Sequence, residues 1–231
     1  MAQVLDTKML SNRFLRNKDI INQSLLDEIT IIGLGGIGST VVTLLSIMGF
    51  DKIIGYDDDI LEEHNLSSTT YPHSSLGVAK VDAALKQAQD YSGAETYFSA
   101  KKEKWDSSKG LTSKVITCLD NMDTRMGVYE EWVKNQDREL LVDLRMDAFS
   151  MEMVTATKEN DEYDKYWVPD GDIEPAPCTM KHTIFTSSII AGFGVNQVFN
   201  CVANKPFYLY IWSGLIPLNL RRESLVKPTI K

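Results

Sequence analysis

Two carboxylates stand where this chain could hold a phosphorylated ligand. Asp57, the first of three consecutive aspartates, follows the apolar segment 52–56, and Asp120 follows the apolar segment 114–119. Both segments are predicted strands, and in an open parallel sheet a ligand lies beyond the carboxyl ends of the strands. We therefore expect Asp57 to contact a ribose hydroxyl and Asp120 to face a metal ion. A second interpretation of Asp120 is the N-cap of a helix predicted over 122–135.

A glycine-rich turn follows the apolar, β-branched segment 29–32. Gly33 would allow a tight turn out of the strand, and Gly35 and Gly36 would let the backbone lie against a phosphate without a Cβ in the way. Gly38 would let the next helix close on the sheet, with its N-terminus directed at the anion. The three aspartates begin 19 residues later, close to the spacing of a ribose-binding carboxylate. The alternative is a purely structural turn between a strand and a helix.

Basic side chains at two places in the chain could be either functional or merely solvated. Lys80 lies in the first turn of a predicted helix, where a cation is unfavourable unless an anion is near. It is otherwise an ordinary solvated lysine. Arg13 and Arg16, near the start of the chain, are by residue type alone best explained as solvated charges at a helix end.

The elements that must position these residues alternate along the chain. They predict an α/β, Rossmann-like fold with a mostly parallel sheet, helices on both faces and an antiparallel C-terminal extension. A long segment, 158–178, has no periodicity and is expected to be a mobile crossover loop. Helices are predicted over 19–26, 40–48 and 122–135, with a further helix after Gly77 and an apolar helix opened by Cys178-Thr179. The further predicted strands are 95–100, 140–146 and 151–157, and a hairpin is predicted over 207–222 around Ser213-Gly214.

The composition restricts the class of protein. With 231 residues and 43% hydrophobic content, the chain is expected to form one domain spanning 1–231. Its net charge of −8 makes nucleic acid an unfavourable partner. No signal peptide or membrane span is predicted, because the longest apolar stretch carries several polar side chains. Three cysteines without a CxxC pair favour the reducing cytoplasm and provide no zinc framework.

Taken together, the motifs resemble the ThiF/MoeB/HesA family, the bacterial relatives of ubiquitin-activating enzymes. The likeness covers roughly residues 10–215, and its doubled central glycine differs from the commoner dinucleotide pattern. The motifs that carry it are Gly33-Leu34-Gly35-Gly36-Ile37-Gly38-Ser39, Asp57-Asp58-Asp59, Asn65-Leu66, Gly77-Val78-Ala79-Lys80-Val81, Asp120-Asn121 with Arg125, and Arg13-Phe14-Leu15-Arg16-Asn17.

This resemblance implies a reaction. The protein would bind ATP and Mg²⁺ and adenylylate a carboxylate, the C-terminal glycine of a ubiquitin-like or sulfur-carrier protein. It would act as a homodimer in which Arg16 reaches the ATP of the partner protomer. The implied nucleotide-binding residues are Gly33, Gly35, Gly36, Gly38, Asp57, Asp59, Asn65, Lys80, Asn121 and Arg125, the implied catalytic residues are Arg16, Lys80, Asp120 and Cys178, and Asp120 would hold the metal.

Cys178 has a role of its own in this hypothesis, because several relatives keep a cysteine at the end of this loop that takes the activated carboxyl as a thioester or persulfide adduct. A helix N-terminus lowers the pKa of a thiol, so the predicted location suits a nucleophile. The alternative is a small packing residue near a proline turn. Cys118, in a strand, and Cys201, in a helix, are expected to be core residues.

Two departures from the family pattern keep other functions open. Ser68 stands where the family usually has a phosphate-binding arginine, and the CxxC zinc pairs of many members are absent. Loss of a cation at the phosphates can cost orders of magnitude in rate, so a catalytically weak nucleotide-binding scaffold for a ubiquitin-like partner is an alternative. An NAD-dependent oxidoreductase would explain Asp57 but not Lys80 or Asp120. Activation of a carboxylate on modified tRNA is disfavoured by the acidic charge.

Overall fold

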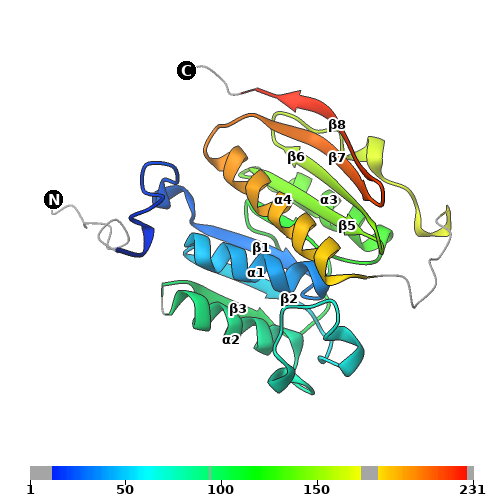
Figure 1. Cartoon of the computed structure of the whole chain (residues 1–231). Helices are drawn as coiled ribbons and strands as arrows, with labels where there is room; N and C mark the ends of the chain where they lie inside the picture. Colours follow the sequence, from blue (N-terminus) through cyan, green and yellow to red (C-terminus); the bar gives the residue numbers. More distant parts are fainter. Residues whose placement is uncertain (1–11, 94, 173–181, 228–231) are drawn as a thin grey trace.

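The computed structural model describes residues 12–93, 95–172 and 182–227 and contains one mixed eight-stranded sheet (Figure 1). The strand order is β3-β2-β1-β4-β5-β6-β7-β8, in which the pairs from β3 to β5 are parallel and those from β5 to β8 antiparallel. This is the predicted Rossmann-like sheet with an antiparallel extension. The strands are β1 (Glu28–Ile32), β2 (Lys52–Tyr56), β3 (Tyr97–Lys101), β4 (Lys114–Thr117), β5 (Leu140–Met146), β6 (Ser150–Thr157), β7 (Phe207–Leu215) and β8 (Leu218–Val226).

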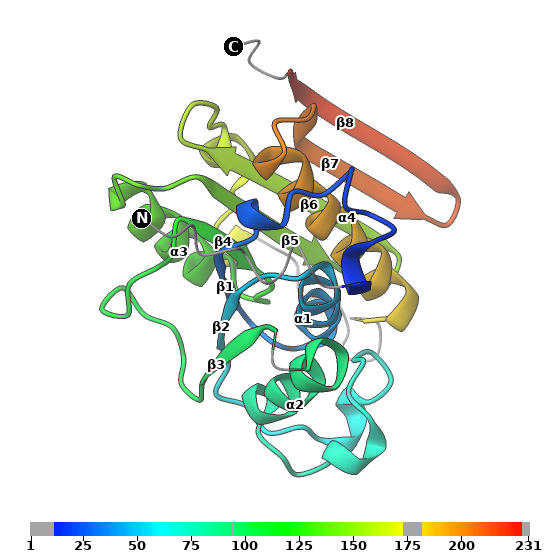
Figure 2. The same cartoon turned by 90° about the vertical axis from the view of Figure 1, so that its left-hand side faces the viewer.

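In the part of the chain that the structure describes, four α-helices cover the two faces of the sheet. In Figure 2, α1 (Gly36–Met48), α2 (Lys80–Ser92) and α4 (Ile184–Val202) lie on one side of the strands and α3 (Met122–Lys134) on the other. Alternate residues of β1 face the two sides: Ile31 packs into the core under α1, whereas Ile32 packs into the core under α3. β1 is therefore buried on both faces, which explains its continuous apolar sequence.

The register of the parallel strands brings the candidate residues to one edge. Ile32, the last residue of β1, pairs with Tyr56 of β2 and Thr117 of β4. The segments that begin at residues 33, 57 and 118 therefore leave the sheet side by side. Because the three connections share this edge, the glycine turn and the two carboxylates predicted beside it start from neighbouring positions.

Three predicted elements differ in the structure. Residues 19–26 form no α-helix; short 3₁₀ turns at Asn12–Phe14 and Gln23–Leu25 lead into β1 instead. The hairpin turns at 216–217 rather than at Ser213-Gly214, because β7 keeps pairing with β6 through Gly214. α4 begins at Ile184, where Thr183 is the N-cap. It does not begin at Cys178.

The connection from β6 to α4 contains local structure in its described part. Residues 158–172 include 3₁₀ turns at Tyr163–Tyr166 and Asp170–Asp172, and Tyr163 is buried. Cys178 lies outside the described residues. None of the helices in the described ranges combines the length and the apolar character that a membrane span requires.

Candidate functional site

Gly33 and Gly38 make the turn between β1 and α1 sterically feasible. Gly33 has a φ of +90° and donates its N–H to the carbonyl of Tyr56 at 2.9 Å. A Cβ on Gly33 would lie 2.7 Å from the carbonyl oxygen of Cys118, and one on Gly38 would lie 2.0 Å from the carbonyl oxygen of Gly33. Both glycines are thus required by the close approach of backbone to backbone.

Gly35 and Gly36 have different surroundings. Gly35 is the N-cap of α1, and a Cβ built there would meet nothing within 4 Å. A Cβ on Gly36 would lie 2.9 Å from the carbonyl oxygen of Ser68 and 3.1 Å from Cε of Met146. The backbone therefore faces open space at Gly35, next to the helix N-terminus, whereas Gly36 accommodates the loop that contains Ser68. An anion could approach the first turn of α1 from the Gly35 side.

Asp57 is bonded directly to the glycine turn. Its Oδ2 accepts the N–H of Leu34 at 2.7 Å, and its Oδ1 accepts the N–H of Asp59 at 2.9 Å. Burial raises the pKa of this carboxyl above its ordinary value of 3.8, and the charge of Lys80 and the two N–H donors oppose that shift. Each oxygen keeps capacity to accept a further hydrogen bond, such as one from a ribose hydroxyl.

Lys80 is a buried cation at the start of α2. Its Nζ lies 2.7 Å from Oδ2 of Asp59, and the side chain of Lys80 is 9% exposed while that of Asp59 is 63% exposed. An ammonium has three donors, so this ion pair leaves donors for a phosphate. The carboxylates of Asp57, Asp58 and Asp59 lie within 4.8 Å of one another and could also provide oxygen ligands to a cation.

Asp120 lies beyond β4 with its side chain exposed. The helix cap expected of Asp120 is made by Asn121, whose Oδ1 accepts the N–H and the hydroxyl of Thr124, each at 2.7 Å. The cap interpretation of Asp120 is therefore wrong, because the helix begins one residue later than that interpretation requires. The carboxylate of Asp120 could act as an oxygen ligand of a divalent cation.

Arg125 points into the protein. Its guanidinium is 3% exposed and donates to the carbonyl oxygens of Leu119 and Leu144 and to the carboxylate of Asp143. Burial lowers the pKa of Arg125 to about 10, and the neighbouring Arg145 contributes to that shift. In this arrangement the side chain holds the loop from β4 to α3 against β5, so its described contacts are structural ones.

Asn65 and Ser68 shape the loop that packs on Gly36. Oδ1 of Asn65 accepts the N–H of Glu62 at 3.0 Å and so caps the short turn Glu63–Asn65. Ser68, which stands where the family has an arginine, is buried, and its carbonyl accepts the hydroxyl of Ser187 at 3.3 Å. The loop is thus tied to α4, and Asn65 uses its carbonyl oxygen in a local cap.

Arg16 lies at the opposite end of α1 from the glycine turn. A Cβ built on Gly49, the residue after α1, would lie 2.6 Å from Cζ of the Phe14 ring, so Phe14 packs against this end of the helix. Arg13 donates to the carbonyl of Ser46, in the last turn of α1, at 2.7 Å. These contacts place the N-terminal segment at the C-terminal end of α1. A 13-residue helix is about 20 Å long, so the structure does not bring Arg16 to the glycine turn of its own chain.

The two described cysteines are unsuited to nucleophilic chemistry. Burial raises the pKa of the thiols of Cys118 and Cys201 to about 12. Both are therefore protonated near neutral pH, as expected of core residues. Because α4 begins at Ile184, the helix N-terminus invoked for Cys178 lies six residues further along the chain.

Sequence reasoning missed three residues near this edge. The hydroxyl of Tyr71 is buried and donates to the carbonyl of Leu34 at 2.9 Å, within the glycine turn. Asp143 is fully buried on β5 and accepts from Arg125, Arg145 and other donors; an aspartate between the apolar residues Val142 and Leu144 was a signal for such a cluster. Asp170 contacts the start of α3. No pattern in the neighbouring residues of its acidic loop predicted that contact.

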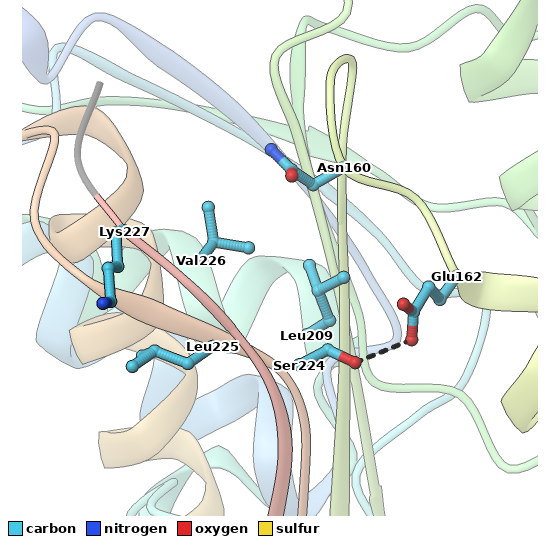
Figure 3. A pocket seen from close by; sticks show the side chains of 7 residues that line it. All are labelled: Asn160, Glu162, Leu209, Ser224, Leu225, Val226 and Lys227. Carbon is cyan, nitrogen blue, oxygen red and sulfur yellow. Dashed lines mark hydrogen bonds between the residues drawn. The ribbon is translucent and has the colours of Figure 1, made fainter. Parts of the chain in front are cut away.

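Two hollows lie at opposite ends of the strands. The larger, about 570 Å³, is lined by residues of β7, β8 and the segment after β6, and within it Ser224 donates to Glu162 at 2.8 Å (Figure 3). This larger hollow lies at the end of the sheet where the C-terminal end of β6 pairs with the N-terminal end of β5. The glycine turn leaves the sheet at the other end of the strands. The smaller, about 210 Å³, is lined by Met146, which also touches Gly36, and by Trp212. Of these two hollows, the smaller one is linked to the candidate site through Met146, which lines it and lies next to Gly36.

Comparison with known proteins identifies related sequences and folds. The sequence model of the ThiF family matches residues 18–209. Ubiquitin-like modifier-activating enzyme 5 of Oryza sativa subsp. japonica is 27% identical over 118 residues, covering 44% of this chain and 28% of that protein. The enzyme of the same name from Caenorhabditis elegans is 27% identical over 146 residues, covering 55% and 35%. The matched part of the chain thus spans about a third of these relatives.

Solved structures share the whole fold at low identity. A crystal structure of selenomethionine PaaA has a TM-score of 0.76 at 19% identity and covers 96% of this chain and 75% of that one. A crystal structure of E. coli MccB with ATP has a TM-score of 0.73 at 15% identity, covering 95% and 73%. These likenesses establish the fold.

Proposed function

The chain belongs to the ThiF family, and from that premise we propose that it binds ATP with magnesium and adenylylates a carboxylate. The observation that carries the proposal is the meeting of three groups at one sheet edge. The open backbone of Gly35 caps α1, Asp57 is bonded to the same turn, and Lys80 is paired with Asp59 beside Asp57. A nucleotide needs such a combination of N–H donors, a hydroxyl acceptor and a cation.

In the proposed reaction a carboxylate oxygen attacks the α-phosphorus of ATP. The bond between the α-phosphorus and the bridging oxygen breaks, which gives an acyl-adenylate and pyrophosphate. The protein contributes position and positive charge. The N–H groups at the start of α1 and the ammonium of Lys80 stabilise the phosphate charge, and Asp57 and Asp59 accept from the ribose hydroxyls. Asp120 would hold magnesium, which supplies further charge neutralisation when bound.

The other implied residues take supporting roles in this proposal. Gly33 and Gly38 form the turn, and Gly36 accommodates the Ser68 loop. Asn65 keeps its side-chain amide as a donor beyond the cap that its oxygen makes. Asn121 and Arg125 hold the loop of Asp120 through α3 and β5 rather than contacting the nucleotide, and a direct contact from either would require their described bonds to change.

The proposed substrate is the C-terminal glycine of a ubiquitin-like or sulfur-carrier protein. The support is the name of the curated relatives, which are modifier-activating enzymes. The small hollow next to Met146 offers room for an extended chain end at the sheet edge. We further propose a homodimer in which Arg16 serves the site of the partner protomer, since Arg16 lies about a helix length from the turn of its own chain.

Transfer to Cys178 is the second step of the proposal. The thiolate would attack the acyl carbon and AMP would leave, giving a thioester. A Cys178→Ser protein should then form adenylate but no thioester that a thiol reagent cleaves, and an unchanged thioester would remove this step. We also propose that residues 1–231 form one adenylyltransferase domain that acts in the cytoplasm, in keeping with three cysteines and no CxxC pair.

Exchange of labelled pyrophosphate into ATP tests the adenylylation. With a candidate carrier protein present, we expect exchange by the wild type, a loss of about 10²-fold or more in Asp120→Ala, and no loss in Glu130→Ala, which removes an exposed carboxylate of α3. Equal exchange by Asp120→Ala and Glu130→Ala would refute the assigned role of Asp120. A reaction without the carrier protein reports any contaminating exchange activity.

A nucleotide-binding scaffold is the second candidate function. Ser68 favours it, because a buried serine supplies no charge where the family has an arginine. Magnesium-dependent ATP binding without exchange, for any carrier that binds, would favour the scaffold. Binding of NAD in place of ATP would favour an oxidoreductase instead.

A further inference from the structure

The segment from β6 toward α4 is fastened to the site edge by its own side chains. Near its start, the hydroxyl of Tyr163 donates to the carboxylate of Asp143 at 2.9 Å, and Arg145 donates to the carbonyl of Tyr166 at 2.7 Å. Further along, Nε1 of Trp167 donates to the carbonyl of Met122 at 3.0 Å. The described part of this segment therefore lies along the polar cluster of β5 and reaches the first residue of α3.

Asp170 completes this attachment at the N-terminus of α3. Its Oδ1 accepts the N–H of Met122 at 2.9 Å, and its Oδ2 accepts the N–H of Asp123 at 3.3 Å. The side-chain amide of Asn121 also donates to Oδ2. Three donors from consecutive residues thus converge on one carboxylate that is 47 to 49 positions away in the chain.

This contact is favourable for two physical reasons. The first N–H groups of a helix lack partners within the helix, and Asp170 supplies acceptors for two of them. A negative charge at a helix N-terminus also interacts favourably with the helix dipole. Asn121 is the N-cap, so its Oδ1 faces Thr124 while its amide faces Asp170. Both polar atoms of the Asn121 side chain are therefore hydrogen-bonded, one to Asp170 and one to the first turn of α3.

We propose that Asp170 is a positioning residue for Asp120. By holding Asn121 and the first turn of α3, it fixes the direction in which the chain carries Asp120 away from β4. This inference rests on the proposed function, because it assigns Asp120 to magnesium. Groups that orient a metal ligand typically change metal affinity about 10- to 100-fold when removed.

The test compares Asp170→Ala with Asp170→Asn and with Asp172→Ala, an exposed aspartate of the same turn. Magnesium-dependent ATP binding is measured by calorimetry and pyrophosphate exchange by label, each over a magnesium titration. We expect Asp170→Ala to raise the half-saturating magnesium concentration about 10-fold or more. Asp170→Asn keeps one oxygen acceptor, so its shift should be smaller, and Asp172→Ala should match the wild type.

The outcomes separate this inference from the proposed function. If Asp170→Ala loses thermal stability but keeps the magnesium half-saturation of the wild type, Asp170 is only a helix cap and the inference is wrong. Increased activity in Asp170→Ala would also overturn it, since the contact would then be inhibitory. If the wild type binds Mg–ATP without exchange, adenylylation fails while the binding titration still decides the role of Asp170. A wild type that binds no Mg–ATP overturns both.

Discussion

Replacement of Lys80 by methionine tests the central electrostatic argument. Lys80 is a buried lysine whose Nζ lies 2.7 Å from Asp59, and its charge partly offsets the pKa increase that burial causes at Asp57. Methionine has a similar length and an apolar side chain, so it keeps the packing at the start of α2 while it removes the positive charge. Without that charge, Asp57 and Asp59 lose the buried cation that lies beside them.

The structure predicts a large functional effect and a small effect on stability. Asp59 is 63% exposed, so the ion pair is expected to contribute at most about 1 kcal/mol to the free energy of unfolding. For a chain of this length, that corresponds to a decrease in Tm of about 2–4 °C. A donor aimed at charge that develops on the phosphates is worth about 10²–10³ in rate. We expect a loss of that size in pyrophosphate exchange, together with weaker ATP binding.

The matched control is Lys86→Met on the same helix. Lys86 is an exposed lysine that pairs with Asp90 at 3.0 Å, so the substitution also removes one cation and one ion pair. Calorimetry of ATP binding, exchange rates and thermal unfolding are compared for the two variants and the wild type. If Lys80→Met keeps exchange within about threefold of Lys86→Met, the assignment of Lys80 to the phosphates is refuted.

Three further substitutions and one chemical-modification experiment probe single groups. Gly38→Ala places a Cβ 2.0 Å from the carbonyl oxygen of Gly33, so chemical unfolding should show a loss of several kcal/mol in the free energy of unfolding. The Cβ of Gly35→Ala meets open space, so this variant should weaken ATP binding with a smaller loss of stability. The pKa of Asp57 is raised in the folded state, so the contribution of this carboxyl to stability is present below pH 3.8 and is lost as pH rises through the raised value. Asp57→Asn should flatten that part of the plot of the free energy of unfolding against pH. An unchanged slope in this plot contradicts the pKa shift. The thiol of Cys118, with its pKa raised to about 12, should resist alkylation at pH 8 in the native protein and react after denaturation, as peptide mapping would show.

Much of the fold follows from local sequence patterns. The apolar, β-branched segments at 29–32, 52–56, 114–119 and 140–146 predicted the parallel strands, and the structure confirms them with shifts of one or two residues. Such segments are recognisable because a strand buried on both faces has little use for polar residues. The start of α4 was not predictable in this way, because apolar character alone does not specify which residue serves as the N-cap.

The placement of charged residues was only partly accessible from sequence. Asp57 and Asp120 were expected at one edge because parallel strands end together, and the registers of β1 with β2 and β4 bring the strand ends Tyr56 and Thr117 beside Ile32. For Arg125 and Arg16, residue type and spacing do not specify where in the fold the side chain lies or which way it points. Arg125 turns inward because the buried carboxylate of Asp143 lies next to α3, and Arg16 follows Phe14 to the far end of α1.

Local sequence patterns were enough to indicate which chemistry this chain offers: a glycine turn after a strand, carboxylates after neighbouring strands, and a lysine at a helix start. These features depend on residues close together in the chain and on the rule that parallel strands share an edge. Tertiary structure decided which groups remain open to a ligand. Gly36 is closed by the Ser68 loop and α3 is capped by Asp170, because packing brings together residues tens of positions apart whose contact leaves no local pattern.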